Sequence, residues 1–188
     1  MKKVVKFGGS SLADSEQFKK VGAIITSDPS RIYVIPSAPG KRFSGDDKVT
    51  DLLYRMYNKA YKDEDFGEEL DEIKSRYQEI IDGLELTGFS LEGEFAQIER
   101  KMTQSPDSNY AASRGEYLNG RIMARYLNYT FIDAKDVIFL TNMEISTRRR
   151  PIRFSPMFSP RRPKRSFRAF TEGVLTDMSR PFPEAVPT

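Results

Sequence analysis

The chain has 188 residues, enough for one domain, and carries a net charge of +3 from 30 basic and 27 acidic residues. It contains no cysteine and no histidine, which excludes disulfide frameworks, thiol metal sites and imidazole acid–base chemistry. No apolar run resembles a secretory signal peptide or approaches the length of a membrane span, so we expect a soluble, cytoplasmic protein.

A strand over residues 4–7, a glycine turn and a helix beginning near Asp14 open the chain. The two adjacent glycines let backbone N–H groups approach an anion, because no Cβ stands in the way. Lys6 adds a full positive charge, Ser10 and Ser11 add hydroxyl groups, and the helix N-terminus adds a partial positive charge. The turn therefore predicts a phosphate site, although an ordinary Gly-Gly strand-to-helix turn would have the same pattern.

Further strands are predicted over residues 31–37, 129–133 and 137–140, mostly as continuous apolar runs of the kind buried in parallel sheets. Between them, residues 46–103 carry apolar side chains at helical spacing and predict a helical subdomain. This alternation of strands and helices favours an α/β fold, with a mainly parallel sheet inside a three-layer sandwich.

Three further segments lie at the ends of these elements. Ser37-Ala38-Pro39-Gly40-Lys41 leaves the second strand, Lys48-Val49-Thr50-Asp51-Leu52-Leu53 starts the helical subdomain, and Ser113-Arg114-Gly115-Glu116 opens an amphipathic helix. Together with the opening turn, these segments resemble the aspartate kinases of the amino-acid kinase superfamily, in the same order and at similar spacing. The resemblance covers residues 1 to about 140 and implies the amino-acid kinase fold, incomplete in this chain.

The resemblance implies transfer of the γ-phosphoryl group of ATP to the β-carboxylate of L-aspartate, the first step of the lysine, threonine and methionine branch. It implies that Lys6 is catalytic and binds the phosphoryl group together with Gly8, Gly9 and Ser10. Mg²⁺ would arrive with ATP, and the intact parent enzyme would be a homo-oligomer. A carboxylate nucleophile is already ionised at neutral pH and needs no general base, which fits a chain without histidine.

The resemblance also implies that Ser37, Thr50 and Glu116 contact aspartate, with Glu116 paired to its ammonium group. The residues by themselves leave a second interpretation open for each position. Lys6 could be a solvated strand-end lysine, and Ser37 and Thr50 could be turn and helix-cap residues. Glu116 could be a first-turn glutamate favoured by the helix dipole.

The composition changes abruptly near residue 140. Residues 141–188 contain ten basic and four acidic residues and seven of the 11 prolines, without a helix or strand period. We expect a basic, Pro/Arg-rich and disordered tail. Such a tail could bind nucleic acid or another acidic surface.

A shifted reading frame explains the tail better than nucleic-acid binding does. The family continues with V-I-P-G-F-Y-G and then T-F-S-R-G-G-S-D, and neither block occurs in this chain. Permitted codons for residues 165–172 and 176–188 spell both blocks when they are read from the third base of each codon. We therefore hypothesise that the coding frame slips between about Phe139 and Thr141. Without these blocks, we expect the chain by itself to have negligible kinase activity.

Two alternative functions stay open. One is another member of the superfamily, a kinase for acetylglutamate, glutamate or UMP. The other is a non-catalytic α/β module whose basic tail binds nucleic acid, with an affinity that falls steeply as salt rises.

Overall fold

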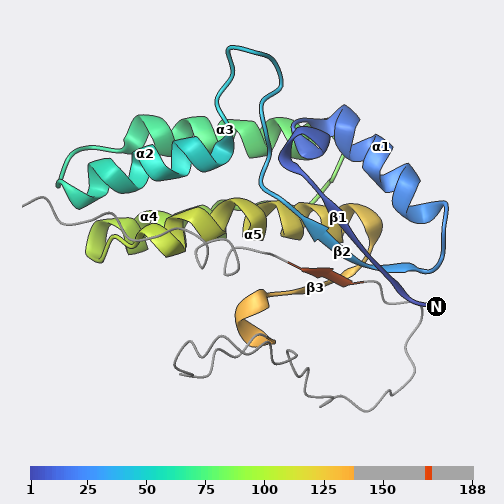
Figure 1. Ribbon diagram of the computed structural model, residues 1–188. Helices are drawn as coiled ribbons and strands as arrows, with labels where there is room; N and C mark the ends of the chain where they lie inside the picture. The colour runs from blue at the N-terminus through green and yellow to red at the C-terminus, as the bar shows by residue number, and fades with distance from the viewer. Residues whose placement is uncertain (138–167, 171–188) are drawn as a thin grey trace, which may run out of the picture.

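The structure, a computed structural model, describes residues 1–137 and the backbone of residues 168–170 (Figure 1). The elements in chain order are β1 Lys3–Phe7, η1 Gly9–Leu12 (a 3-10 helix), α1 Ser15–Thr26, β2 Arg31–Pro36, α2 Val49–Tyr61, α3 Gly67–Gly83, α4 Glu92–Gln104, α5 Ser108–Leu127, β3 Thr130–Ile132, η2 Ala134–Asp136 (3-10) and β4 Arg168–Phe170.

The strands form one parallel sheet in the order β1-β2-β4-β3. The parallel pairing of β1 with β2 sets Lys6 beside Ile35 and Phe7 beside Pro36, so both strands end at the same edge of the sheet. β4 pairs with β2 and with β3. These three residues of the tail therefore differ from the expectation of a tail without regular structure.

Most of the predicted elements have an observed counterpart. Three of the four predicted strands correspond to β1, β2 and β3, and the predicted helical subdomain contains α2, α3 and α4. The fourth predicted strand, residues 137–140, lies outside the described residues except for Val137, which ends the turn η2. The α/β class and the parallel sheet are confirmed.

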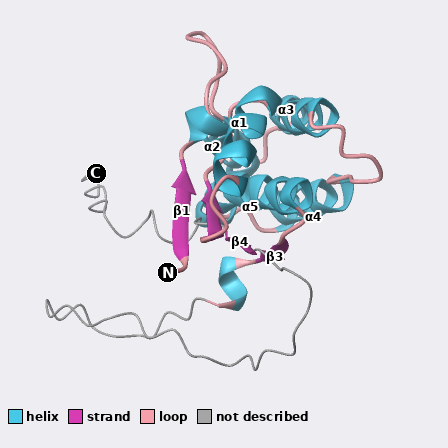
Figure 2. Cartoon of the chain, turned by 90° about the vertical axis from the view of Figure 1, so that its right-hand side faces the viewer, coloured by secondary structure: helices cyan, strands magenta, loops and turns pink. Residues whose placement is uncertain are grey.

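Helix α5 packs along the sheet and joins it to the other α-helices, which lie on the same side (Figure 2). α1 lies so close to α5 that a Cβ on Gly22 would stand 2.6 Å from the ring of Tyr126. α2, α3 and α4 form the helical subdomain next to α5. The described residues thus form two of the three layers that the sequence predicts, in keeping with an incomplete α/β domain.

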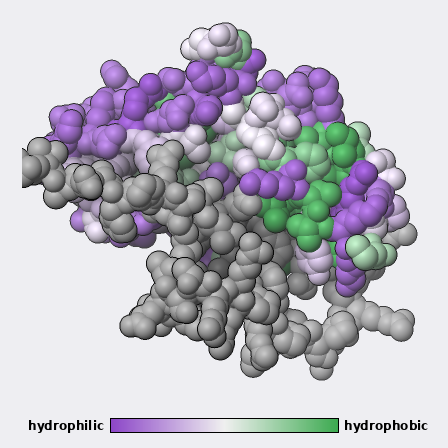
Figure 3. Space-filling view, in the orientation of Figure 1, coloured by the Kyte–Doolittle hydropathy of each residue, from purple (hydrophilic) through white to green (hydrophobic). Residues whose placement is uncertain are grey.

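The core lies between α5 and the helical subdomain. Leu52, Leu53 and Met56 of α2 and Leu118 and Ile122 of α5 are all 0% exposed. Each such side chain contributes about 1.5–3 kcal/mol on burial. The visible outer surfaces of α2 and α3 are hydrophilic, whereas apolar surface gathers on the side of β1 and α1 (Figure 3).

Candidate functional site

Two chain segments meet at the carboxyl edge of β1 and β2. The first is the glycine turn, residues 8–11, and the second is the β2–α2 loop, residues 37–48. The amide of Gly40 donates to the carbonyl oxygen of Gly9 at 2.8 Å. The amide of Ser37 donates to the carbonyl oxygen of Phe7 at 3.0 Å. Crevices at the carboxyl edge of parallel strands are the usual ligand sites of open α/β sheets.

Glycine is required on both sides of this contact. A Cβ on Gly40 would lie 2.6 Å from the carbonyl carbon of Gly9 and 2.7 Å from the amide nitrogen of Ser10. A Cβ on Gly9 would lie 2.9 Å from the carbonyl oxygen of Ala38. In each case the obstacle is backbone, which has no rotamer to change, so the two segments can approach only as glycines.

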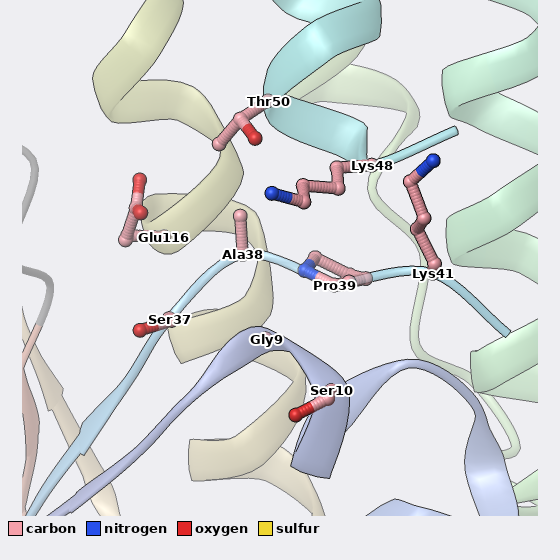
Figure 4. A pocket seen from close by; sticks show the side chains of 10 residues that line it. Gly9, Ser10, Ser37, Ala38, Pro39, Lys41, Lys48, Thr50 and Glu116 are labelled. Atoms are coloured by element: carbon pink, nitrogen blue, oxygen red, sulfur yellow. The ribbon is translucent and has the colours of Figure 1, made fainter. Parts of the chain in front are cut away.

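A cavity of about 450 Å³ opens where the glycine turn, the β2–α2 loop, α2 and α5 converge (Figure 4). It is lined by Gly9, Ser10, Ser37, Ala38, Pro39, Gly40, Lys41, Lys48, Thr50 and Glu116. The close view shows the Lys48 ammonium directed across the cavity, with Thr50 and Glu116 beyond it. Hydroxyl groups, cations and one carboxylate therefore surround the same space, which suits a small ligand with charges of both signs.

The glycine turn continues into a 3-10 helix and only then into α1. The side chain of Asp14 caps α1 by accepting a hydrogen bond from the amide of Gln17 at 2.8 Å. A carboxylate therefore already neutralises the partial positive charge of the α1 N-terminus. The Asp14 cap thus offsets the helix dipole that the sequence suggests as part of the phosphate site. The other groups that the sequence assigns to this site are the glycine amides, Lys6, Ser10 and Ser11.

The β2–α2 loop is fixed by two arginines that pair with the buried Asp46. Arg42 donates to both carboxylate oxygens of Asp46, from Nε and Nη2 at 3.0 Å each, and Arg76 of α3 donates to Asp46 at 2.7 Å. The hydrogen bonds from Arg42 are the main reason that the pKa of Asp46 lies well below its ordinary value. Asp46 is only 5% exposed, so its paired charge belongs to the folded interior.

Helix α5 brings Glu116 to the cavity by close packing against the end of β2. A Cβ on the preceding residue, Gly115, would stand 2.6 Å from the Cβ of Ala38. The buried hydroxyl of Tyr77 donates to the Gly115 carbonyl at 2.7 Å and holds the same turn of α5 from the α3 side. Burial, followed by the nearby Glu116 charge, raises the pKa of Tyr77 well above its ordinary value.

Asn119 lies one turn beyond Glu116 on α5 and is 0% exposed. Its side-chain amide donates to the Ser37 carbonyl at 2.6 Å. This contact ties the end of β2 to α5. It therefore fixes Ser37 and Glu116 relative to each other.

The structure brings five of the residues assigned from the sequence into one cavity: Gly9, Ser10, Ser37, Thr50 and Glu116. Lys6 and Gly8 come just before Gly9 in the chain, and neither of them lines the cavity. Lys6 lies near the end of β1 and is exposed.

The structure excludes the alternative interpretations of Glu116 as a first-turn residue and of Thr50 as a helix cap. α5 begins at Ser108, so Glu116 lies about two turns inside the helix and is not a first-turn residue. The N-cap of α2 is Lys48, and no side chain makes a cap hydrogen bond there, so Thr50 does not cap that helix.

Sequence reasoning assigned no role to several residues of the site. Gly40 and Lys48 belong to the Ser37–Lys41 and Lys48–Leu53 segments. Their positions, in a turn after a strand and at the start of a helix, could have indicated a role in the site. Asn119 lies three residues after Glu116 on one helix face, but nothing in the sequence marks the Ser37 carbonyl as its partner. Arg76 had no signal in the sequence either, because it lies in α3, far from every motif.

Known proteins resemble this chain over most of its length. Residues 1–161 match the amino acid kinase family. The chain belongs to this family. Aspartokinase 3 of Bacillus subtilis is 36% identical over 152 residues, which cover 74% of this chain and 33% of the relative. The bifunctional aspartokinase/homoserine dehydrogenase 1 of Arabidopsis thaliana is 27% identical over 157 residues, covering 72% of this chain and 16% of the relative.

Two solved structures share the fold. The aspartate kinase of Clostridium acetobutylicum superposes with a TM-score of 0.67 at 50% identity, over 70% of this chain and 30% of that one. Aspartokinase III of E. coli, solved with aspartate and ADP, superposes with a TM-score of 0.55 at 21% identity, over 73% of this chain and 32% of that one, and supports the fold alone. This chain therefore spans about a third of the length of the aspartate kinases it matches.

Residues 1–137 contain no helix that is both long enough and apolar enough to cross a membrane.

Proposed function

We propose that this chain carries the L-aspartate-binding and phosphate-binding part of an aspartate kinase, which transfers the γ-phosphoryl group of ATP to the β-carboxylate of L-aspartate. One observation carries the proposal. The glycine turn, the β2–α2 loop and α5 form a single cavity that contains Ser37, Thr50 and Glu116. The 50% identity to the Clostridium acetobutylicum aspartate kinase supports aspartate over the other substrates of the superfamily.

The charges around the cavity suggest how aspartate is held. Glu116 pairs with the substrate ammonium group, and the hydroxyls of Ser37 and Thr50 donate to a carboxylate. Lys48 lines the same cavity and adds a cation, with its ammonium directed across it. L-Aspartate, which carries one ammonium group and two carboxylates, would thus find a negative partner for its ammonium group and positive or hydroxyl partners for its carboxylates.

The glycine turn is the proposed phosphate site. Gly8 and Gly9 offer backbone N–H groups, Ser10 offers a hydroxyl, and Lys6 offers a positive charge near the transferring group. The fit rests on the close approach of Gly9 to Gly40, since a Cβ on either residue would meet backbone of the other segment. When ATP is bound, it supplies the phosphoryl group. The protein contributes alignment and stabilisation of charge on the phosphoryl oxygens.

Mg²⁺ enters with ATP in this proposal and keeps most of its own water ligands. In the part of the chain that the structure describes, no group of three or more acidic, histidine or cysteine side chains could hold a metal ion. We therefore assign the ion to no residue of this segment. The wider proposal includes lysine-branch biosynthesis, a cytoplasmic location and a homo-oligomeric parent enzyme.

The tail carries a separate part of the proposal, the slip of the coding frame between about Phe139 and Thr141. It is supported by the two family blocks that permitted codons spell in the shifted frame. A competing account has the tail complete the sheet as encoded, because β4 lies in the tail and the family match continues to residue 161. The nucleotide sequence decides between them: codons that forbid V-I-P-G-F-Y-G and T-F-S-R-G-G-S-D would exclude the slip.

The substrate proposal is tested by titrating the 188-residue chain with L-aspartate while backbone amide resonances are recorded. We expect saturable shifts at Gly9, Gly40 and Thr50, and weaker binding of L-glutamate, which is one methylene longer. Equal binding of both acids would point to another member of the superfamily. Shifts scattered over the surface would contradict the proposed site.

Kinase activity is tested by ADP release. The chain by itself is expected to turn over far below the roughly 1–100 per second of ordinary kinases. A polypeptide translated in the shifted frame is expected to release ADP only when L-aspartate is present. Ordinary turnover by the 188-residue chain would contradict the account of the tail.

A further inference from the structure

Arg76 of α3 is the most deeply buried charged side chain in the described part of the protein, with 2% of its surface exposed. It does not line the cavity. Its guanidinium makes four hydrogen bonds: Nη1 to the Asp46 carboxylate at 2.7 Å and to the Asp47 carbonyl at 3.1 Å, and Nη2 to the Gly40 carbonyl at 2.8 Å and to the Ala13 carbonyl at 3.4 Å.

Three of these acceptors belong to the β2–α2 loop, and the fourth, Ala13, lies two residues beyond the glycine turn. Ala13 directly follows the 3-10 helix of the glycine turn, whereas Gly40, Asp46 and Asp47 belong to the β2–α2 loop. One guanidinium therefore connects the β2–α2 loop to the residue that follows the 3-10 helix. It binds the carbonyl of Gly40, whose amide donates to Gly9 at 2.8 Å in the contact that closes the cavity.

Neutralising Asp46 does not account for this arrangement. Arg42 already donates to Asp46 from its backbone amide at 2.8 Å and from its side chain at 3.0 Å. The other acceptors of Arg76 are uncharged backbone carbonyls. A rigid, planar group with several donors can reach them together, and the single ammonium of a lysine cannot.

We propose that Arg76 is a positioning residue for the candidate site, holding the glycine turn and the β2–α2 loop at the separation that ligand binding requires. It acts through Gly40 and does not touch the ligand. The effect on ligand affinity rests on the proposed function. The effect on the two segments is independent of it.

The test compares Arg76→Lys and Arg76→Met with wild type in the full 188-residue chain. Arg76→Lys keeps a positive charge next to Asp46, so the buried carboxylate is not left unpaired. Arg55→Met is the matched control, because Arg55 pairs with Asp47 at 2.6 Å on the exposed side of the same loop. Two quantities are measured: amide hydrogen exchange residue by residue, and the affinity for L-aspartate.

The Val49 amide donates to the Pro39 carbonyl of the β2–α2 loop at 3.1 Å and so reports on this loop. We expect both Arg76 variants to speed exchange of the Gly40 and Val49 amides by about tenfold or more, while Leu118 in the core of α5 keeps its wild-type rate. We expect L-aspartate to bind at least about tenfold more weakly, since misplaced contacts lose most of their energy. Arg55→Met should change neither quantity.

Three results would overturn the inference. One is Arg76→Lys behaving like wild type in both measurements. Another is amide exchange that rises at Leu118 as much as at Gly40, which would mean that Arg76 stabilises the whole fold and not the two segments in particular. The last is a rise in Gly40 amide exchange in the Arg76 variants while their affinity for L-aspartate stays that of wild type. If wild type itself does not bind L-aspartate, the proposed function fails, and the exchange data alone still judge whether Arg76 holds the two segments.

Discussion

The two segments that form the cavity are held in different ways. The glycine turn is local: β1 leads into it, and the Ser11 amide closes it by donating to the Gly8 carbonyl at 3.1 Å. The β2–α2 loop depends on distant residues, with Arg76 bonded to Gly40 across 36 positions and Asn119 bonded to Ser37 across 82. A motif can therefore mark where a ligand binds while residues without any motif set the shape of the site.

The largest effect is expected where the two segments touch. Gly40→Ala would place a Cβ 2.6 Å from the Gly9 carbonyl carbon, so one backbone segment must move. We expect a loss of about 3 kcal/mol in the free energy of unfolding, at the upper end for overpacking, together with loss of L-aspartate binding. Chemical denaturation and titration check both.

Gly93→Ala is the matched control for that substitution. Gly93 lies in α4, and nothing lies within 4 Å of a Cβ placed there. Alanine should leave stability unchanged or raise it slightly, since it is the better helix former. Equal losses of stability for Gly40→Ala and Gly93→Ala would show that the Gly9–Gly40 contact is no more sensitive to an added Cβ than an open helix surface.

The next effect is expected where α3 holds α5. Tyr77→Phe removes the hydroxyl that donates to the Gly115 carbonyl at 2.7 Å, so this oxygen keeps only its hydrogen bond within the helix. We expect a loss of about 1–2 kcal/mol in the free energy of unfolding. Denaturant titration measures it. Tyr54→Phe, at a ring that is 46% exposed, is the control and should have almost no effect.

Acid should weaken the loop more than the glycine turn. The hydrogen bonds from Arg42, with the charge of Arg76, keep the pKa of Asp46 below its ordinary value in the folded protein. The unfolded chain therefore takes up this proton at a higher pH than the folded one, so the stabilisation is complete above about pH 4 and is lost as the pH falls below it.

Unfolding curves between pH 7 and pH 3 check this prediction. Asp46→Asn should have a shallower loss of stability in acid than wild type, although it is less stable at pH 7. Parallel pH profiles for the two proteins would show that Asp46 does not contribute to the acid sensitivity.

The smallest effect is expected on the exposed side of the same loop. Arg55 pairs with Asp47 at 2.6 Å, but both side chains are more than a third exposed. Water screens such pairs, so Arg55→Met should change the free energy of unfolding by less than about 0.5 kcal/mol. A thermal melt checks this. A loss as large as that of Tyr77→Phe would mean that exposed pairs also hold the loop.

Much of the fold follows from local patterns in the sequence. The apolar runs of β1 and β2 and the helical spacing in α2 to α4 predict their elements within a few residues. Ser113 was a less reliable marker, since α5 begins at Ser108 and the motif lies inside the helix. Asp107 is the residue that caps α5, through the Tyr110 amide at 2.8 Å.

The site was predicted less completely than the fold. Gly9, Ser37 and Glu116 could be chosen because glycine turns, strand ends and charged helix positions have recognisable surroundings. Arg76 and Asn119 could not, because their roles depend on which carbonyl groups the fold brings to them. In a sequence they are an arginine in a charged helix and an asparagine among apolar residues.

Binding of succinate shows whether Glu116 pairs with the substrate ammonium group. Succinate keeps both carboxylates of L-aspartate but lacks the ammonium group. We expect wild type to bind L-aspartate at least about tenfold more tightly than succinate, and Glu116→Gln to remove this preference while the protein stays folded. Equal affinities in wild type, or a preference that survives Glu116→Gln, would contradict this pairing.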